Sequence, residues 1–232
     1  MIKLIGFDLD DTLWDIIPVM IRAERILDSW LKENVVELKY TVTEMRQLRN
    51  EVLDIHPELA HKITELRRLI IQRAMTISGI SNNRVELLSK QAIDVFLTAR
   101  NQITLFEGAE DILSTLSDHY TICALSNGNA DIKRLGLEHL FDFAYSAEQV
   151  GGSKPSHHLF SAALEHTNLA AEEMIYIGDD PLLDVDAAMD RGIHSIWMDR
   201  GTKSPGERKA DKIITHITQL PAAIREIAQR ES

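Results

Sequence analysis

The sequence has little cysteine, and it has no long apolar run. Its one cysteine, Cys123, rules out an intrachain disulfide and favours a reducing compartment. Because Cys123 lies inside the apolar run YTICALS, we interpret it as a buried structural thiol rather than a nucleophile. No apolar stretch approaches the ~20 residues of a membrane span, and we recognise no signal peptide before the first strand-like run. These absences predict a cytoplasmic protein with no membrane partner.

The sequence also lacks an excess of basic residues. Its 36 acidic and 25 basic residues give a formal net charge of -11. Such a chain offers no basic face to a phosphate backbone, which argues against binding to nucleic acid or to an anionic membrane. A small phosphorylated substrate stays compatible, because one local cation can outweigh the global charge. The apolar fraction of 44% is ample for a buried core.

The segment from residue 15 to residue 101 has a helical pattern throughout. Thr41 followed by Glu44 is typical of a helix start, and Gly79 is typical of a helix end. Four helices with short connections predict a small helical bundle. The predicted helices are 19–34, 41–55, 58–79 and 83–102.

The rest of the chain alternates short apolar runs with helical patterns. Such alternation predicts βαβ crossovers and a mainly parallel sheet, and the N-terminal run IKLIGFD fits the same sheet. The helical segment is therefore inserted after the first strand of an α/β fold. The later predicted strands are 120–126, 143–147, 174–178, 194–198 and 212–215, and the predicted helices are 108–118, 130–140, 156–168, 182–192 and 217–229.

Polar groups follow several of these strands. FDLDDT follows the first strand, SNGN the second and GDDPLLD the run MIYI, while GGSKPS lies on a loop before a helix. Each motif taken alone also has a purely structural interpretation, as a turn, a helix cap or a solvated loop. Open parallel sheets bind ligands outside the carboxyl ends of their strands, so the joint occurrence predicts one site. The predicted members are Asp8, Asp10, Ser126, Lys154, Asp179, Asp180 and Asp184.

These residue types suit phosphoryl transfer. A carboxylate can attack phosphorus to give an aspartyl-phosphate, and a lysine can neutralise the phosphate. Asp10 is placed to protonate the leaving oxygen and then to activate water, so we expect neighbouring carboxylates to raise its pKa. Mg²⁺ prefers such oxygen ligands, whereas no cysteine and histidine cluster at ligand spacing favours zinc.

The motifs FDLDDTL, LSN, SKP and GDDPLLD resemble, in order, the four motifs of the haloacid dehalogenase superfamily. The resemblance covers the whole chain. It implies a Rossmann-like three-layer α/β/α core over 1–14 and 102–232, with a helical cap domain over 15–101. More narrowly, TLWDIIPVMIRAER, SNGNAD and SKP are similar to a bacterial branch containing phosphatases of the flavin pathway, which act on FMN and on ribitylaminouracil phosphate.

The resemblance also implies roles for the acids. Asp8 is the nucleophile, and Mg²⁺ is held by the Asp8 side chain, the Asp10 backbone carbonyl and an acid of the fourth motif. We assign that acid to Asp179, with Asp180 as a second candidate. Asp184 is expected to act from behind the metal ligands or to hold Lys154.

The remaining site residues are expected to bind the phosphoryl group. Ser126 and the backbone amides after it donate hydrogen bonds, and Lys154 supplies a point charge. Asn127 and Gly128 shape the same loop. The predicted substrate-binding residues are therefore Ser126, Asn127, Gly128 and Lys154.

The prediction is a Mg²⁺-dependent phosphatase, monomeric or homodimeric, that acts on a small phosphorylated metabolite. One alternative is a phosphomutase or phosphotransferase of the same fold. Another is a metal-independent dehalogenase, although such members of the superfamily lack an acid at the position of Asp10. A signalling receiver domain and a non-catalytic binding protein fit less well. Candidate cap contacts to substrate are His56, His61, Arg67 and Arg68.

Overall fold

A six-stranded, fully parallel sheet forms the centre of the larger part of the chain. The computed structural model describes residues 1–230, and the strand order is β3-β2-β1-β4-β5-β6. β1 pairs with β2 on one side and with β4 on the other, so the first strand of the chain becomes central. This confirms the predicted α/β fold with a parallel sheet. The strands are β1 (Leu4–Phe7), β2 (Thr121–Ser126), β3 (Phe143–Ser146), β4 (Met174–Gly178), β5 (His194–Met198) and β6 (Lys212–Ile214).

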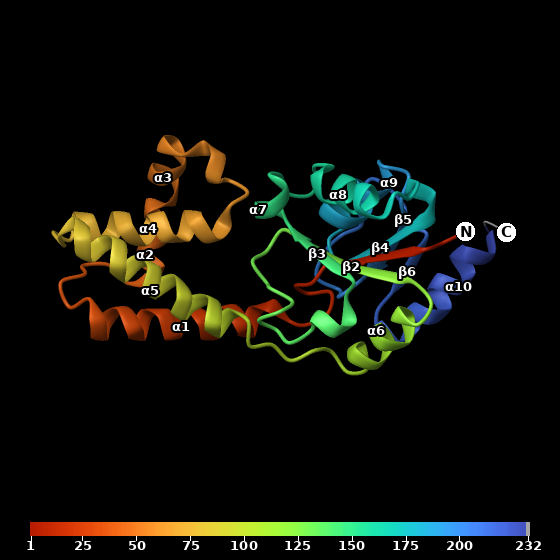
Figure 1. Ribbon diagram of the computed structural model, residues 1–232, viewed down its shortest axis with the longest axis horizontal. Helices are drawn as coiled ribbons and strands as arrows, with labels where there is room; N and C mark the ends of the chain where they lie inside the picture. Colours follow the sequence, from red (N-terminus) through yellow and green to blue (C-terminus); the bar gives the residue numbers. More distant parts are fainter. Residues whose placement is uncertain (231–232) are drawn as a thin grey trace. The chain divides into compact units, whose positions relative to one another are not determined.

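Helices cover both faces of this sheet. Figure 1 shows α8 and α9 on one face and α6 and α10 on the other. Every residue of β1 and β4 is buried, as expected of parallel strands covered on both sides. On the α8 face, Leu4, Leu125 and Phe160 belong to one apolar cluster. The helices are α6 (Ala109–Ser117), α7 (Ala147–Val150), α8 (His158–Thr167), α9 (Ala187–Met189) and α10 (Leu220–Arg230).

Two helix predictions in this part of the chain need correction. The helix expected over 130–140 is wrong, because Gly136 takes a left-handed φ of 72° and ends a single turn. Only a 3-10 turn, Glu138–Leu140, follows it. The helix expected over 182–192 begins as a π-helical turn, Pro181–Asp186, and continues as α9. Turns of this kind often occur at functional sites.

Residues Ile17–Ile103 form a second compact unit, and Met1–Ile16 with the described residues from Thr104 onward form the first. Buried side chains such as Leu27, Ile71 and Phe96 make up the core of the second unit. Its helices are α1 (Ile16–Asn34, which starts one residue before the unit), α2 (Val42–Met45), α3 (Arg49–Ile55), α4 (Ile63–Ile77) and α5 (Asn82–Arg100). The four-helix prediction placed too few breaks in this segment.

The breaks have local causes. The segment predicted as one helix over 41–55 runs through α2, a 3-10 turn at Arg46–Leu48 and α3. It ends at Ile55 because His56 precedes Pro57, and a residue before proline is pushed out of helical conformations. The helix predicted from residue 58 begins at Ile63, since Lys62 has non-helical backbone angles.

The structure also bears on the predictions about membrane spans and about the single cysteine. Among the described residues, no helix is long and apolar enough to cross a membrane. Cys123 is fully buried, as predicted, and this burial raises the pKa of its thiol. The cytoplasmic location and the oligomeric state stay predictions.

The start of α2 yields a test of stability. The Thr41 side chain accepts a hydrogen bond from the Glu44 amide, and the Glu44 carboxylate accepts one from the Thr41 amide at 2.8 Å. Thr41→Ala removes this cap and should lower the free energy of unfolding by about 1 kcal/mol, as measured by urea denaturation. Thr43→Ala, on the same helix and exposed, should change it by less than about 0.5 kcal/mol. Equal losses in the two variants would contradict the capping role.

Candidate active site

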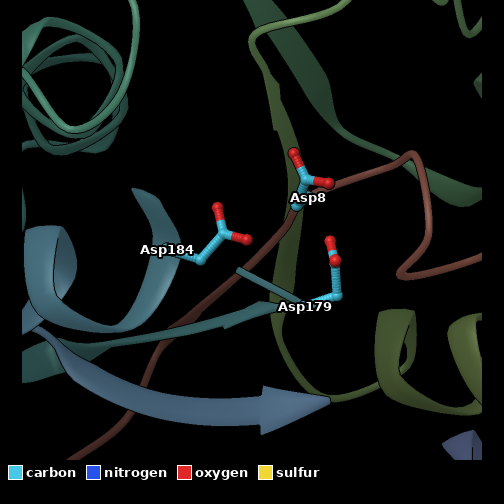
Figure 2. Close-up of side chains that lie close together, drawn as sticks. All are labelled: Asp8, Asp179 and Asp184. Atoms are coloured by element: carbon cyan, nitrogen blue, oxygen red, sulfur yellow. The ribbon is translucent and has the colours of Figure 1, made fainter. Parts of the chain in front are cut away.

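Carboxylates from two neighbouring strand ends converge. Asp8 follows β1, Asp179 follows β4, and Asp184 lies on the π-helical turn after β4. Figure 2 shows their side chains close together, and one carboxylate oxygen from each lies within 4.8 Å of the others. All three are buried. The close approach requires Gly178, since a Cβ there would lie 2.3 Å from the Asp184 carboxyl carbon.

The predicted site residues lie around one cleft of about 140 Å³. It is lined by all nine of them, together with one lysine and one leucine that the sequence reading did not single out. The two additions come from the loop after β5 and from the turn after β4. The lining residues are Asp8, Asp10, Ser126, Asn127, Gly128, Lys154, Asp179, Asp180, Leu183, Asp184 and Lys203.

A buried ammonium group stands at the back of this cleft. Lys154 Nζ donates to Asp8 Oδ1 at 2.7 Å, to Asp184 Oδ1 at 2.7 Å and to Tyr176 Oη at 2.7 Å. The Leu125 carbonyl oxygen lies 3.1 Å from the same nitrogen and accepts from Tyr176 Oη at 2.8 Å. Tyr176 thus links the lysine to the β2 backbone, and the ammonium has a fixed position.

The charges of this group depend on one another. Burial raises the pKa of Asp8 well above its usual range, more than the attraction of Lys154 lowers it. Burial alone would lower the pKa of Lys154, but attraction to Asp184 and Asp8 outweighs it and keeps the ammonium protonated. One cation is therefore shared by two buried carboxylates, which leaves an excess of negative charge.

Asp10 is held by an aromatic side chain. Trp14 is fully buried, and its indole Nε1 donates to Asp10 Oδ1 at 2.9 Å. Asp11 adopts a left-handed φ of 61° and accepts from the Ile16 amide at 3.0 Å, so it supports the start of α1 and lies outside the cleft lining. The nearby Thr12 hydroxyl is buried with no hydrogen-bond partner among residues 1–230.

The SNGN loop is braced against the lysine loop. The Asn127 side chain accepts from the Lys154 amide at 2.7 Å and donates to the Lys154 carbonyl at 2.9 Å, next to the cis Lys154–Pro155 peptide bond. This places Asn127 as a clamp between loops. Ser126 Oγ accepts from the Gly128 amide at 2.9 Å, so the hydroxyl proton remains available to a ligand, whereas the Gly128 amide is already used.

The two adjacent acids after β4 have different environments. Asp180 Oδ1 caps the π-helical turn by accepting from Leu182 and Leu183 amides at 3.0 and 2.9 Å. Burial raises the pKa of Asp179, whereas the Leu183 amide and Lys203 outweigh burial and lower the pKa of Asp180. Lys203 Nζ lies 2.6 Å from Asp179 Oδ2 and 2.9 Å from Asp180 Oδ2.

The donor set fits a hard divalent cation. Its three convergent side chains offer carboxylate oxygens only, the ligand type that Mg²⁺ and Ca²⁺ prefer. Of the three, Asp184 is the least available to a cation, because both of its carboxylate oxygens accept hydrogen bonds. Oδ1 accepts from Lys154, and Oδ2 accepts from the Asp180 amide at 2.9 Å. Both Asp8 and Asp179 line the cleft, and their bonds to Lys154 and Lys203 use Asp8 Oδ1 and Asp179 Oδ2, which leaves the other carboxylate oxygen of each for a cation.

The second unit has a cavity of its own, of about 290 Å³. Of the four candidate cap contacts, Arg67 lines this cavity, where it lies 3.8 Å from Glu24 and stacks 4.0 Å over the Phe96 ring. Arg68 pairs with Glu65 and does not line it.

Sequence reasoning missed Trp14 as a partner of Asp10, Tyr176 as a partner of Lys154, and Lys203. Tyr176 carried a signal, because a hydroxyl in a fully buried parallel strand needs a hydrogen-bond partner. Lys203 carried none, since an exposed loop lysine usually faces solvent.

Comparison with known proteins places this site in a family. A profile described as haloacid dehalogenase-like hydrolase matches residues 5–198. The 5-amino-6-(5-phospho-D-ribitylamino)uracil phosphatase YigB of Escherichia coli is 31% identical over 198 residues, 85% of this chain and 83% of that protein. Phosphoserine phosphatase of Thermus thermophilus is 29% identical over 143 residues, 59% of this chain and 56% of that protein.

A solved structure is also similar over nearly the whole chain. It is the crystal structure of a protein named 2-haloacid dehalogenase from Pseudomonas syringae pv. Tomato, with a TM-score of 0.94, 35% identity and coverage of 97% of this chain and 99% of that one. The resemblance read from the four motifs is thereby confirmed. The chain belongs to the haloacid dehalogenase-like hydrolases.

Proposed function

We propose that this hydrolase is a Mg²⁺-dependent phosphatase that hydrolyses small phosphomonoesters through an aspartyl-phosphate on Asp8. The observation that carries the proposal is the convergence of Asp8, Asp179 and Asp184 around the buried ammonium of Lys154. A phosphate group is the ligand that needs both a cation at its oxygens and a fixed nucleophile. In this proposal the first unit is the catalytic core and the second is the cap.

The first half-reaction transfers the phosphoryl group to the enzyme. An Asp8 oxygen attacks phosphorus, and the ester P–O bond breaks as the acyl-phosphate bond forms. Asp10 gives its proton to the leaving oxygen, with its carboxyl oriented by Trp14. The Ser126 hydroxyl, whose oxygen already accepts from Gly128, donates to the transferring group.

The second half-reaction releases phosphate. Asp10 accepts a proton from a water molecule, which attacks phosphorus and breaks the bond to Asp8. The products are inorganic phosphate and the regenerated Asp8 carboxylate. Lys154 neutralises charge on the Asp8 side throughout, and Tyr176 and Asp184 keep it in place.

The Asp8 and Asp179 side chains would hold Mg²⁺, together with the Asp10 backbone carbonyl. When bound, the ion supplies positive charge to the phosphoryl oxygens. Asp184 supports the lysine from behind, because both of its oxygens already accept hydrogen bonds.

The similar Pseudomonas syringae structure makes carbon–halogen hydrolysis a second candidate. That reaction also uses an attacking carboxylate, and a 35% identical protein bears a dehalogenase name. Two features here favour phosphoryl transfer instead. A second acid, Asp10, is held in position by Trp14, and a further carboxylate, Asp179, lies at the nucleophile. The halogen of a 2-haloacid leaves as a halide ion, which needs no proton, so that departure does not require an acid such as Asp10.

A ribityl phosphate is the substrate we propose on the strength of the relative YigB, whose name specifies a ribitylaminouracil phosphate. FMN carries the same phosphorylated ribityl chain. In a phosphomutase, Asp8 would return the phosphoryl group to the substrate rather than pass it to water.

Asp8→Asn should abolish phosphate release, because an amide oxygen is a poor nucleophile toward phosphorus. We expect at least a ~10³-fold loss of kcat, in line with the loss of other catalytic nucleophiles, measured by inorganic phosphate assay. Asp118→Asn, an exposed aspartate at the end of α6, is the control and should retain full activity. Turnover by Asp8→Asn at the normal rate would refute the nucleophile assignment.

Chelation with EDTA should remove activity, and added Mg²⁺ should restore it. Asp179→Asn should weaken Mg²⁺ binding at least about tenfold, the loss typical even of groups behind the ligands. Asp180→Asn should weaken it less, because Asp180 caps a helical turn with Oδ1 and pairs with Lys203 through Oδ2. Isothermal titration calorimetry of the metal-free protein compares the two variants. A larger effect at Asp180 would reverse the assignment.

A substrate panel separates the two reactions. With Mg²⁺ present, we expect phosphate release from the ribitylaminouracil phosphate and from FMN to exceed release from sugar phosphates and nucleoside monophosphates. We expect no halide release from 2-chloropropionate. Halide release that persists in EDTA, with no phosphate release from any ester, would instead establish a dehalogenase. Accumulation of phosphorylated enzyme with little free phosphate would favour a phosphomutase.

A further inference from the structure

Lys203 contacts the acids of the fourth motif from outside that motif. It lies on the loop between β5 and β6, and β5 is the neighbour of β4 in the sheet. Its Nζ is 2.6 Å from Asp179 Oδ2 and 2.9 Å from Asp180 Oδ2. The ammonium therefore occupies a carboxylate that the proposed function assigns to the metal.

The loop that carries Lys203 is anchored at specific points. The buried carboxylate of Asp186 accepts from the Glu207 amide at 2.8 Å and from the Arg208 amide at 2.9 Å. Gly206 passes directly over it, since a Cβ there would lie 2.5 Å from Asp186 Oδ2. The Arg208 guanidinium also donates to Asp190 at 2.6 Å. These contacts hold the loop on the same helical segment that supplies Asp184.

The opposite side of the contact is fixed as well. The Trp197 indole Nε1 donates to the Asp179 carbonyl at 3.0 Å, and Trp197 is itself buried. The Asp179 side chain is 7% exposed, whereas that of Lys203 is 37% exposed. The Asp179 side chain is therefore buried on an anchored backbone, whereas the more exposed lysine stem has room to withdraw from it.

The charge balance explains why a cation is needed there. Five aspartates and two lysines line the cleft, and Lys154 is committed to Asp8 and Asp184. Lys203 is the one further cation of this lining, so Asp179 and Asp180 would otherwise face one another without a counter-charge.

We propose that Lys203 competes with the divalent cation for Asp179 and so sets the Mg²⁺ affinity of the enzyme. The inference rests on the proposed function to the extent that the acids bind a divalent cation. Asp180 retains the ammonium when Asp179 turns to the metal, because its Oδ2 already accepts from Lys203 while its Oδ1 is held by the helix cap. In the metal-bound state, Asp179 thus binds the metal and Asp180 binds the lysine.

Removal of the lysine should tighten metal binding, since it removes both a competitor and a like charge. For Lys203→Gln we expect the Mg²⁺ dissociation constant to fall about five- to tenfold, the range of a modest coupling between two ligands. The measurement is isothermal titration calorimetry on the full-length, metal-free protein. Lys203→Arg retains the charge and should bind Mg²⁺ no more tightly than the unmodified protein.

Lys209→Gln is the matched control. Lys209 lies on the same loop and is exposed, so its substitution removes the same charge without touching Asp179. We expect its dissociation constant for Mg²⁺ to stay within about twofold, because solvent and salt screen the distant charge. If Lys209→Gln gained as much Mg²⁺ affinity as Lys203→Gln, the change in net charge would explain the effect, and the proposal would be overturned.

Thermal unfolding separates a competing lysine from a merely structural one. In EDTA, Lys203→Gln should melt below the unmodified protein, because the acids have lost a counter-cation. At saturating Mg²⁺ the difference should vanish, since the metal replaces the ammonium. If Lys203→Gln melted at a lower temperature in both conditions, or bound Mg²⁺ with unchanged affinity, the competing role of Lys203 would be refuted while the proposed function would stand. Failure of the unmodified protein to bind Mg²⁺ would overturn this proposal and the metal in the proposed function together.

Discussion

The hydrogen bonds of the Lys154 ammonium to Asp8 and Asp184 are the constraint on which the rest of the site depends. A buried charge that loses its partners costs several kcal/mol, so these three groups must meet within hydrogen-bond distance or not be buried at all. That requirement explains surrounding details that carry no chemistry themselves. Gly178 makes room for Asp184, and Asn127 clamps the backbone of the loop that carries the lysine. The strand order then delivers all of them to one edge of the sheet.

The same constraint leaves the site short of positive charge. Lys154 satisfies two carboxylates, three further aspartates line the cleft, and Lys203 is the one other cation in that lining. A protein could avoid this cost by replacing the acids with neutral residues. Retaining them makes sense when the cleft has to bind a divalent cation and a phosphate whose charges complete the balance. In that case the electrostatic cost of the metal-free state is also the source of the affinity for the metal.

Much of this arrangement could be predicted from the sequence, because parallel strands place their carboxyl ends along one edge. The order of the motifs was therefore enough to bring Asp8, Lys154 and Asp179 to one cleft. What escaped prediction depends on side chains rather than on strand ends. Trp14 follows the first motif, and nothing in the sequence pattern indicates that its indole reaches Asp10. Lys203 lies 24 residues from Asp179 in the chain, on a loop whose path is set by Asp186. No local pattern encodes that path.

The segment GDDPLLDVD does more than supply the proposed metal ligand, and the spacing of its acids explains how. Asp180 and Asp184 are four residues apart, so the Asp184 carboxylate reaches the Asp180 amide and its other oxygen reaches Lys154. Asp186, two residues further along the turn, is directed away from Lys154 toward the β5–β6 loop. One helical turn thus connects Asp8, through Lys154, with the loop that positions a second lysine. A movement of this turn would displace both Lys154 and Lys203, so the position of Asp8 and the charge beside Asp179 depend on the same segment.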